Sequence, residues 1–391
     1  MSRRNPEYPT ERFVAENVPE AIWLRLRRLA STQLCRKIIG ASARKLSTDV
    51  IDNKSSGMAW AVRSALGYWD TQLGGLNSRI LSRYYALLQI SIAEQISSDD
   101  PNDDLGSIQR HTEYGHGLFS FKSDSPDFPE NYFIGCLNTG HFPAYCHNLG
   151  FDLKPYVHGK RPRSLNDADT SKIYSLSDLL CRVPELQSVS MEYLNKRPLS
   201  FHIGHSSRNM ANRVERTRTH AEKTGQILFD PPTPGHNVTT YIAIYPHECQ
   251  ITADELNNYC LPIKNIVFEE SKTQFDTNHF VGELEHPKDD FWWQHIDTYK
   301  SGYCGTSLIL PFWGMIDPLA LHLSILYALS IVVRYLPETW HEVEYGKMDH
   351  IRSLLEHYLV IVDNVLPKLA VERLTRTRLL IVQPGGFNAP L

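Results

Sequence analysis

The stretch from Asp317 to Trp340 limits most strongly what this chain can fold into. No charged residue lies between Asp317 and Arg334, and the interval is apolar on nearly every face of a helix. Such a helix has to be enclosed, either by lipid or by protein. A bilayer needs about 20 apolar residues, whereas this run has roughly 16 and includes His322 and two serines. We therefore expect the buried central helix of a soluble, mostly helical core.

The overall composition excludes few classes of function. The chain has 391 residues and a net charge of −4, so its overall charge gives no argument about a nucleic-acid partner. Seven scattered cysteines without a CxxC pair are typical of a reduced cytosolic protein. The N-terminal segment has basic residues but no apolar run of a secretory signal. These observations predict a cytoplasmic protein that does not associate with a membrane.

Helical patterns dominate both ends of the chain. We expect a helix with a basic face at 18–46, a short helix at 57–69, an amphipathic helix at 76–96 and a last helix from Met348. Residues 105–175 are rich in Gly, His, Pro and aromatic residues, which predicts short strands and turns.

The pattern changes to short β-branched or aromatic runs, separated by turns, from residue 225 to residue 310. It predicts an antiparallel insert of about four to six strands. We expect a helical part at 1–224, the β-rich insert at 225–310, and a helical part at 311–391 that completes the core. The predicted fold class is α+β, with one discontinuous helical domain and an inserted sheet.

Three segments of the chain resemble the YaaC-like family of bacterial proteins. They are SRYYALLQISIAEQ at 82–95 followed by HGLFSF, SLSDLLCRVPEL at 175–186, and the stretch from DPLALHLSILYALSIVVRYLPETW through the last helix. The most specific mark is an apolar helix that ends in Ser-x-x-x-Arg-Tyr-x-Pro-x-x-Trp, here Ser330 to Trp340. The segments occur in the right order over most of the chain. The resemblance implies a helical fold with an inserted sheet, and it leaves the activity open.

The helix at 82–95 also resembles the paired-tyrosine helix of HEPN domains, which are helical bundles found in toxin or defence ribonucleases. This resemblance implies an HEPN-like bundle and metal-independent RNA cleavage, with Arg352 and His357 as the matching residues. The histidine would transfer a proton of the 2′-hydroxyl, and the arginine would stabilise charge on the phosphate. On an unbroken helix, however, Arg352 and His357 lie about 140° apart and flank the apolar stripe on opposite sides. A partner subunit or a helix start is needed to bring them together.

A second candidate site is a set of basic residues whose side chains suit contacts to phosphates and bases. Two of them lie in one loop, and the others lie in the polar segment 208–223. The set consists of Arg161, Arg163, Arg208, Arg213, Arg216, Arg218 and His220. The alternative is that 208–223 is only an exposed linker into the sheet.

A third candidate is the cluster Cys136, His141, Cys146 and His147, which are ligand types for zinc. Structural zinc sites usually take tighter pairs of ligands. We therefore interpret this segment as a packed loop with small cysteines in the core, and we expect no metal.

Two single residues have a structural and a functional interpretation. Arg334 stands at the end of the apolar helix, where a cation complements the helix dipole, so a structural role is favoured over a catalytic one. His116 fits a satisfied buried histidine, although the glycines beside it also allow it to face a pocket.

The leading hypothesis is an interaction protein that binds nucleic acid or another phosphate-bearing partner in a bacterial stress or antiviral defence system. RNA, DNA and a partner protein of such a system are the partners it implies. One alternative is an HEPN-type ribonuclease that uses Arg352 and His357, and another is a scaffold subunit that forms a homodimer. The chain has no Walker A string, Rossmann glycine pattern, HExxH or nucleophile elbow, and we expect no cofactor.

Overall fold

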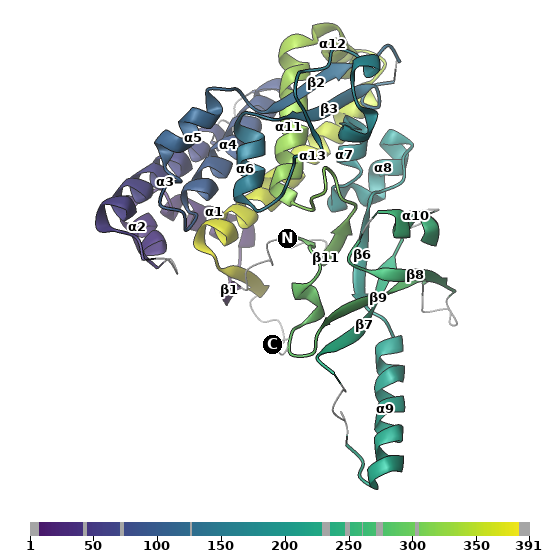
Figure 1. The fold of residues 1–391 in the computed structure, drawn as a ribbon. Coiled ribbons are helices and arrows are strands. Elements are labelled where there is room, and N and C mark those ends of the chain that lie inside the picture. The colour runs from purple at the N-terminus through teal and green to yellow at the C-terminus, as the bar shows by residue number, and fades with distance from the viewer. Residues whose placement is uncertain are drawn as a thin grey trace. The chain divides into compact units, whose positions relative to one another are not determined.

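The computed structural model divides the chain into two compact units (Figure 1). Unit 1 consists of residues 1–180 and 312–391, and unit 2 consists of residues 181–311. Helices and strands occur in both units, which confirms the predicted α+β class. The structure describes residues 8–41, 45–70, 74–125, 127–228, 235–246, 251–259, 261–270, 277–301 and 305–382.

The structure describes four of the seven cysteines. Cys35, Cys136, Cys146 and Cys181 are buried free thiols. The other three, Cys249, Cys260 and Cys304, lie outside the described residues, as does the N-terminal segment 1–7.

The core of unit 1 is built around α11 (Pro318–Tyr335). The side chain of Asp317 caps this helix by accepting a hydrogen bond from the Ala320 amide at 2.8 Å, and Pro318 suits the first helical position because it needs no donor there. By length and composition α11 alone among the described helices could cross a membrane, yet 78% of it is buried inside the protein. The prediction of a buried central helix is therefore confirmed.

The helices of unit 1 that surround α11 include α4, α12 and α13, which pack directly against it. The helices other than α11 are α1 (Val18–Arg28), α2 (Thr32–Gly40), α3 (Thr48–Trp69), α4 (Leu76–Ile96), α5 (Leu105–Thr112), α6 (His141–Asn148), α7 (Leu176–Leu180), α12 (Pro337–Tyr345) and α13 (Asp349–Thr375).

Two helix boundaries differ from the sequence prediction. The single helix expected at 18–46 is divided into α1 and α2, because the amides of residues 29–31 bond to carbonyls three residues earlier and close α1. The helix expected from residue 57 begins earlier, at Thr48, where the Ser47 hydroxyl accepts a hydrogen bond from the Val50 amide at 3.4 Å. Local capping bonds, rather than the apolar pattern, determine both boundaries.

Unit 1 also contains two small sheets. In the first, β1 (Thr10–Val14) pairs in parallel with β12 (Arg378–Val382), so two strands from opposite parts of the sequence lie side by side. In the second, β3 (Tyr132–Leu137) lies between β2 (Leu118–Lys122) and β4 (Val157–His158), and β5 (Ile173–Ser175) pairs with β3. Among the described strands β2 pairs only with β3, and its other edge is left to other elements of the unit.

Unit 2 is a six-stranded antiparallel sheet with short helices. Its strand order is β10 (Tyr299–Ser301), β11 (Gly305–Ile309), β6 (Ser200–His205), β7 (Asn237–Tyr245), β9 (His279–Pro287) and β8 (Lys264–Glu269). The helices are α8 (Gln187–Leu194), α9 (Arg208–Thr224) and α10 (Ala253–Asn258). The segment expected at 225–310 supplies all of these strands except β6, which precedes it.

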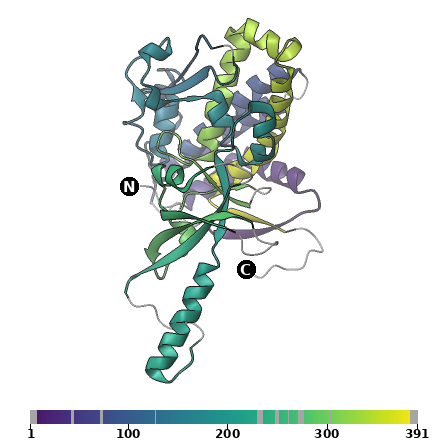
Figure 2. The ribbon, with the colours of Figure 1, turned by 90° about the vertical axis from the view of Figure 1, so that its right-hand side faces the viewer.

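Helix α9 extends away from the sheet of its own unit (Figure 2), and none of its residues is buried. Its first turn is tied to the sheet. Asn209 donates to the Tyr241 carbonyl at 2.6 Å and accepts from the Tyr241 amide at 2.8 Å.

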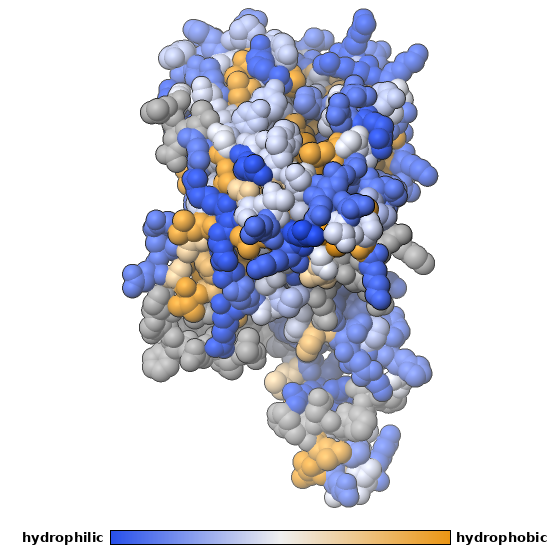
Figure 3. Space-filling model, turned by 90° about the vertical axis from the view of Figure 1, so that its left-hand side faces the viewer, coloured by the Kyte–Doolittle hydropathy of each residue, from blue (hydrophilic) through white to orange (hydrophobic). Residues whose placement is uncertain are grey.

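The molecular surface drawn in Figure 3 is mostly hydrophilic, with apolar side chains in small scattered groups. Isolated apolar residues of this kind are normal on the surface of a folded protein. This face therefore gives no sign of a large apolar interface.

Candidate anion-binding site

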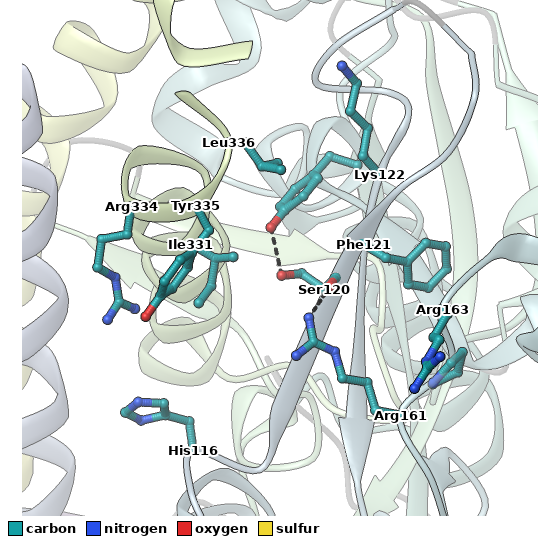
Figure 4. A pocket seen from close by; sticks show the side chains of 12 residues that line it. His116, Ser120, Phe121, Lys122, Arg161, Arg163, Ile331, Arg334, Tyr335 and Leu336 are labelled. Atoms are coloured by element: carbon teal, nitrogen blue, oxygen red, sulfur yellow. Dashed lines mark hydrogen bonds between the residues drawn. The ribbon is translucent and has the colours of Figure 1, made fainter. Parts of the chain in front are cut away.

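A cavity of about 830 Å³ opens within unit 1 beside the free edge of β2 (Figure 4). Four segments build its walls: the loop before β2, strands β2 and β3, the loop at 161–163, and the C-terminal end of α11. The lining residues are His116, Ser120, Phe121, Lys122, Tyr132, Arg161, Pro162, Arg163, Ile331, Arg334, Tyr335 and Leu336. Segments that are far apart in sequence therefore share one site.

The lining of this cavity is cationic. Lys122, Arg161, Arg163 and Arg334 contribute positive charge, and among the described residues no Asp or Glu lines the cavity. Within the described part of the chain, none of these four side chains is ion-paired. A hollow lined by one sign of charge concentrates the electrostatic potential and attracts ligands of the opposite sign.

Arg161 and Arg334 are held in place by neutral partners. Arg161 donates from Nη2 to the Ser120 carbonyl at 3.0 Å. Arg334 donates from Nε to the Ser330 carbonyl at 2.9 Å and from Nη2 to the Ser330 hydroxyl at 3.2 Å. These neutral acceptors occupy only some of the five N–H donors of each guanidinium. Both side chains therefore keep free donors for a ligand, and their positive charge is not neutralised. Figure 4 shows the two groups on either side of the cavity.

The other two cations of the lining are Lys122 and Arg163. Lys122 donates from Nζ to the hydroxyl of Thr339 at 3.1 Å, and in Figure 4 its side chain points away from Arg161. Arg163 shares the loop of Arg161 and, like Arg161, is exposed to solvent. Both add positive charge at the rim.

His116 is presented to the cavity by a glycine-flanked loop. Gly115 and Gly117 have φ angles of 88° and 75°, a region that side-chain-bearing residues rarely adopt. A Cβ atom on Gly117 would lie 2.3 Å from Pro143 Cδ, so only glycine lets the loop pack this closely against α6. Behind the cavity, His116 Nδ1 lies 2.8 Å from the Tyr84 hydroxyl. Burial, and then the charge of Arg334, lower the pKa of His116.

A layer of buried tyrosines forms the back of the site. Tyr132 shares a hydrogen bond of 2.7 Å with Ser120 Oγ, and Tyr327 donates to the Leu118 carbonyl at 2.8 Å. Burial raises the pKa of Tyr84, Tyr132 and Tyr327, so all three hydroxyls stay protonated. The wall is therefore fixed before any ligand arrives.

The sequence model of one protein family, described as YaaC-like Protein, matches residues 53–374. The chain belongs to the YaaC-like family. All residues that line the cavity fall inside the matched segment. No curated protein and no solved structure matches this YaaC-like chain. The match confirms the YaaC-like resemblance, whereas no comparison supports the HEPN-like one.

The predicted basic set of the YaaC-like chain falls into two groups. Arg161 and Arg163 line the cavity of unit 1. The other five members, Arg208, Arg213, Arg216, Arg218 and His220, lie on α9 of unit 2. Arg208 pairs with Glu269, and Arg218 pairs with Glu215 at 2.7 Å and Glu222 at 3.8 Å.

The sequence interpretation did not assign three cavity residues to a site. Lys122 carried no signal, because a lysine at the end of a short strand is usually a solvated residue. Arg334 was expected to act structurally, and it does bond its own helix, but it also faces the cavity. The glycines beside His116 were the one local sign of a pocket position.

Arg352 and His357 lie on one continuous helix, α13, and both are exposed. Arg352 pairs with Glu356 at 3.1 Å and donates to the Glu344 carbonyl at 3.5 Å. Neither residue lines the cavity. Within one chain, the unbroken helix keeps the two side chains on different faces.

The cysteine and histidine cluster is divided between the core and the surface. Cys136 and Cys146 are buried, and Cys146 Sγ lies 3.9 Å from Met315 Sδ. His141 is buried with Nε2 at 2.8 Å from the Ser91 hydroxyl, whereas His147 is exposed. Among the described residues, no group of three or more His, Cys, Asp or Glu side chains is placed to hold a metal ion.

Proposed function

We propose that this YaaC-like protein binds a phosphate-bearing ligand in the cationic cavity of unit 1. The observation that carries the proposal is that, in the part of the chain that the structure describes, four cations and no carboxylate line the cavity. Other arginines of unit 1 pair with carboxylates, as in the Arg25–Glu11 and Arg83–Asp363 pairs. An anionic ligand would supply the charge that the protein does not.

The size and chemistry of the cavity suit a small phosphate-bearing molecule. Ligand sites in proteins measure about 300–1,000 Å³, and this cavity measures about 830 Å³. Guanidinium groups match phosphate oxygens in a planar, two-pronged geometry. Removal of one charge-assisted hydrogen bond costs about 1.5–3 kcal/mol, which corresponds to roughly 10- to 100-fold in affinity.

The test is isothermal titration calorimetry with pyrophosphate and adenosine 5′-monophosphate at low ionic strength. The Arg161→Gln and Arg334→Gln variants should each lose roughly 10- to 100-fold in affinity. The matched control is Arg110→Gln, which removes the same charge from an exposed position of α5 outside the cavity. Absence of binding to the wild-type protein, or equal losses in all three variants, would refute the proposal.

A second candidate function is contact with nucleic acid along α9. This helix carries five Lys or Arg residues against two Glu residues, and none of its residues is buried. Filter binding of RNA and DNA at moderate salt tests it with the double variant Arg216→Glu and Arg218→Glu. The control, Lys37→Glu with Arg110→Glu, makes the same charge change at exposed positions of unit 1. Unchanged retention in the α9 variant would exclude this surface.

A role in a bacterial stress or antiviral defence system, and a location in the cytoplasm, belong to the same proposal. They rest on the sequence resemblance and on the cysteine pattern. The ribonuclease alternative at Arg352 and His357 gains no supporting contact, and we do not extend it.

A further inference from the structure

The hydrogen bond behind His116 determines which of its nitrogens carries the proton. Tyr84 is only 1% exposed, and among the described residues its hydroxyl has a single hydrogen-bond partner, His116 Nδ1 at 2.8 Å. If Nδ1 carried the proton, the buried Tyr84 O–H would have no acceptor, which is costly. Tyr84 therefore donates to Nδ1. In the neutral imidazole, the proton is then on Nε2.

The surroundings of His116 keep this imidazole neutral. Burial and the positive charge of Arg334 both disfavour the imidazolium form, and none of the described residues that line the cavity is a carboxylate that could stabilise it. The ionisable groups around His116 are Tyr84 of α4, His141 of α6, and Tyr327 and Arg334 of α11. Since Nδ1 is committed to Tyr84, the Nε2–H is the donor left for a ligand.

We infer that the cavity binds a terminal phosphate, a phosphomonoester dianion, carried on a nucleotide. This inference rests on the proposed function and specifies its ligand class. Arg161, Arg334 and the Nε2–H of His116 would donate to the phosphate. A monoester presents three terminal oxygens and up to two negative charges, whereas a diester presents two such oxygens and one charge. A cavity with several unpaired cations and a neutral donor therefore favours the monoester.

An aromatic ring at the mouth of the cavity points to the nucleotide. Tyr335 lines the cavity and is 65% exposed to solvent. The Arg334 guanidinium lies 5.1 Å from the centre of the Tyr335 ring. Exposed tyrosine rings and arginine planes are the surfaces on which nucleobases stack. Free nucleotides and phosphorylated ends of RNA share this chemistry.

The experiment compares adenosine 5′-monophosphate with 3′,5′-cyclic adenosine monophosphate, which has the same base and sugar but a diester. At pH 7.5, the monoester should bind on the order of tenfold more tightly, by the added charge-assisted contact. Equal affinities would refute the inference and leave the proposed function standing. If neither nucleotide binds and pyrophosphate does not bind either, both the inference and the proposed function are refuted. An RNA oligonucleotide with and without a 5′-phosphate then tells whether the phosphate is taken from a free nucleotide or from an RNA end.

The pH dependence gives an independent test of the donor. The second pKa of a phosphomonoester is about 6, so affinity should rise between pH 5 and pH 7.5 as the dianion forms. If a charged imidazolium were the binding group, affinity would instead fall as pH rises, and the inference would be wrong.

Three variants separate the role of His116 from a purely structural one. His116→Ala removes the donor and should lose on the order of tenfold in affinity for the monoester. His116→Gln keeps an N–H near the position of Nε2 and should recover much of that loss. Tyr84→Phe frees the imidazole to take either tautomer and should weaken binding severalfold. If His116→Ala binds as tightly as the wild type, or if Gln behaves like Ala, the assignment of Nε2–H as donor is refuted.

Discussion

Replacement of Arg373 by methionine should destabilise unit 1 far more than the loss of an ordinary salt bridge. Arg373 of α13 lies 3.2 Å from Glu94 of α4 and also pairs with Asp317, the cap of α11. The side chains of Arg373, Glu94 and Asp317 are 17%, 12% and 8% exposed. Tyr145 of α6 adds a hydrogen bond of 2.7 Å to Glu94. One guanidinium therefore joins four helices.

The expected magnitude follows from what Arg373→Met leaves behind. Two carboxylates stay buried without their cation, and breaking a buried pair in this way costs about 3–5 kcal/mol. Burial raises the pKa of Glu94 even though the charge of Arg373 opposes the shift. The ionised form of Glu94 therefore depends on Arg373 for its stabilisation. With an m-value of roughly 3 kcal/mol/M, the urea midpoint of unit 1 should fall by about 1 M or more.

The assay is urea denaturation followed by circular dichroism, with hydrogen exchange of α4 and α11 as a local readout. The control is Arg27→Met, whose partner Asp70 is 52% exposed and whose own side chain is 49% exposed. Such a pair is worth about 0.2–1 kcal/mol. Adding Glu94→Gln to Arg373→Met should recover part of the loss, because one uncompensated charge is removed. If the urea midpoints of the Arg27 and Arg373 variants were equal, the ion pairs of Arg373 with Glu94 and Asp317 would behave as solvent-exposed pairs, and the prediction would be wrong.

Three further predictions concern acid, salt and the glycine loop. Burial lowers the pKa of His322 and His141 to about 3, below the value of about 6.5 in an unfolded chain, so the unfolded state takes up protons first as pH falls. Each histidine should therefore cost about 2 kcal/mol of unfolding free energy between pH 6.5 and pH 5, and unchanged urea midpoints at pH 7 and pH 5 would contradict this. The affinity for pyrophosphate should fall steadily between 50 and 300 mM salt, measured by calorimetry, since exposed cations are screened over about 10 Å. Gly140→Ala should destabilise the loop of His116, because its φ is 112° and a Cβ there would lie 2.5 Å from the Gly117 amide; wild-type melting temperature and nucleotide affinity in this variant would exclude it.

The central helix could be predicted from the sequence because a single local property determines its environment. A run without charge from Asp317 to Arg334 cannot be left in water, and α11 is buried as that argument requires. The strands of the insert were equally visible, since alternating β-branched residues and turns are local signals. The break after α1 was not visible, because it depends on amides that bond three residues back at 29–31.

The cavity could not be predicted from sequence, because proximity along the chain does not report proximity in space. Arg161 was grouped with the arginines of 208–218 by residue type, although these lie in the other unit. Its actual neighbours in the site come from β2 and the end of α11. Only the fold brings Arg161, Arg334 and His116 together. The unpaired state of their charges is likewise a property of the tertiary structure.

The charged groups of α11 lie at its two ends, Asp317 at the N-terminal cap and Arg334 near the C-terminus. At a helix C-terminus a cation contributes about 0.3–1 kcal/mol through the helix dipole, so Arg334→Gln should lower the free energy of unfolding by no more than that. If Arg334 binds phosphate, the same variant loses roughly 10- to 100-fold in affinity for adenosine 5′-monophosphate. Urea denaturation and calorimetry on one preparation measure both quantities. A large loss of stability with unchanged affinity would make Arg334 a structural residue and would remove one wall of the proposed site.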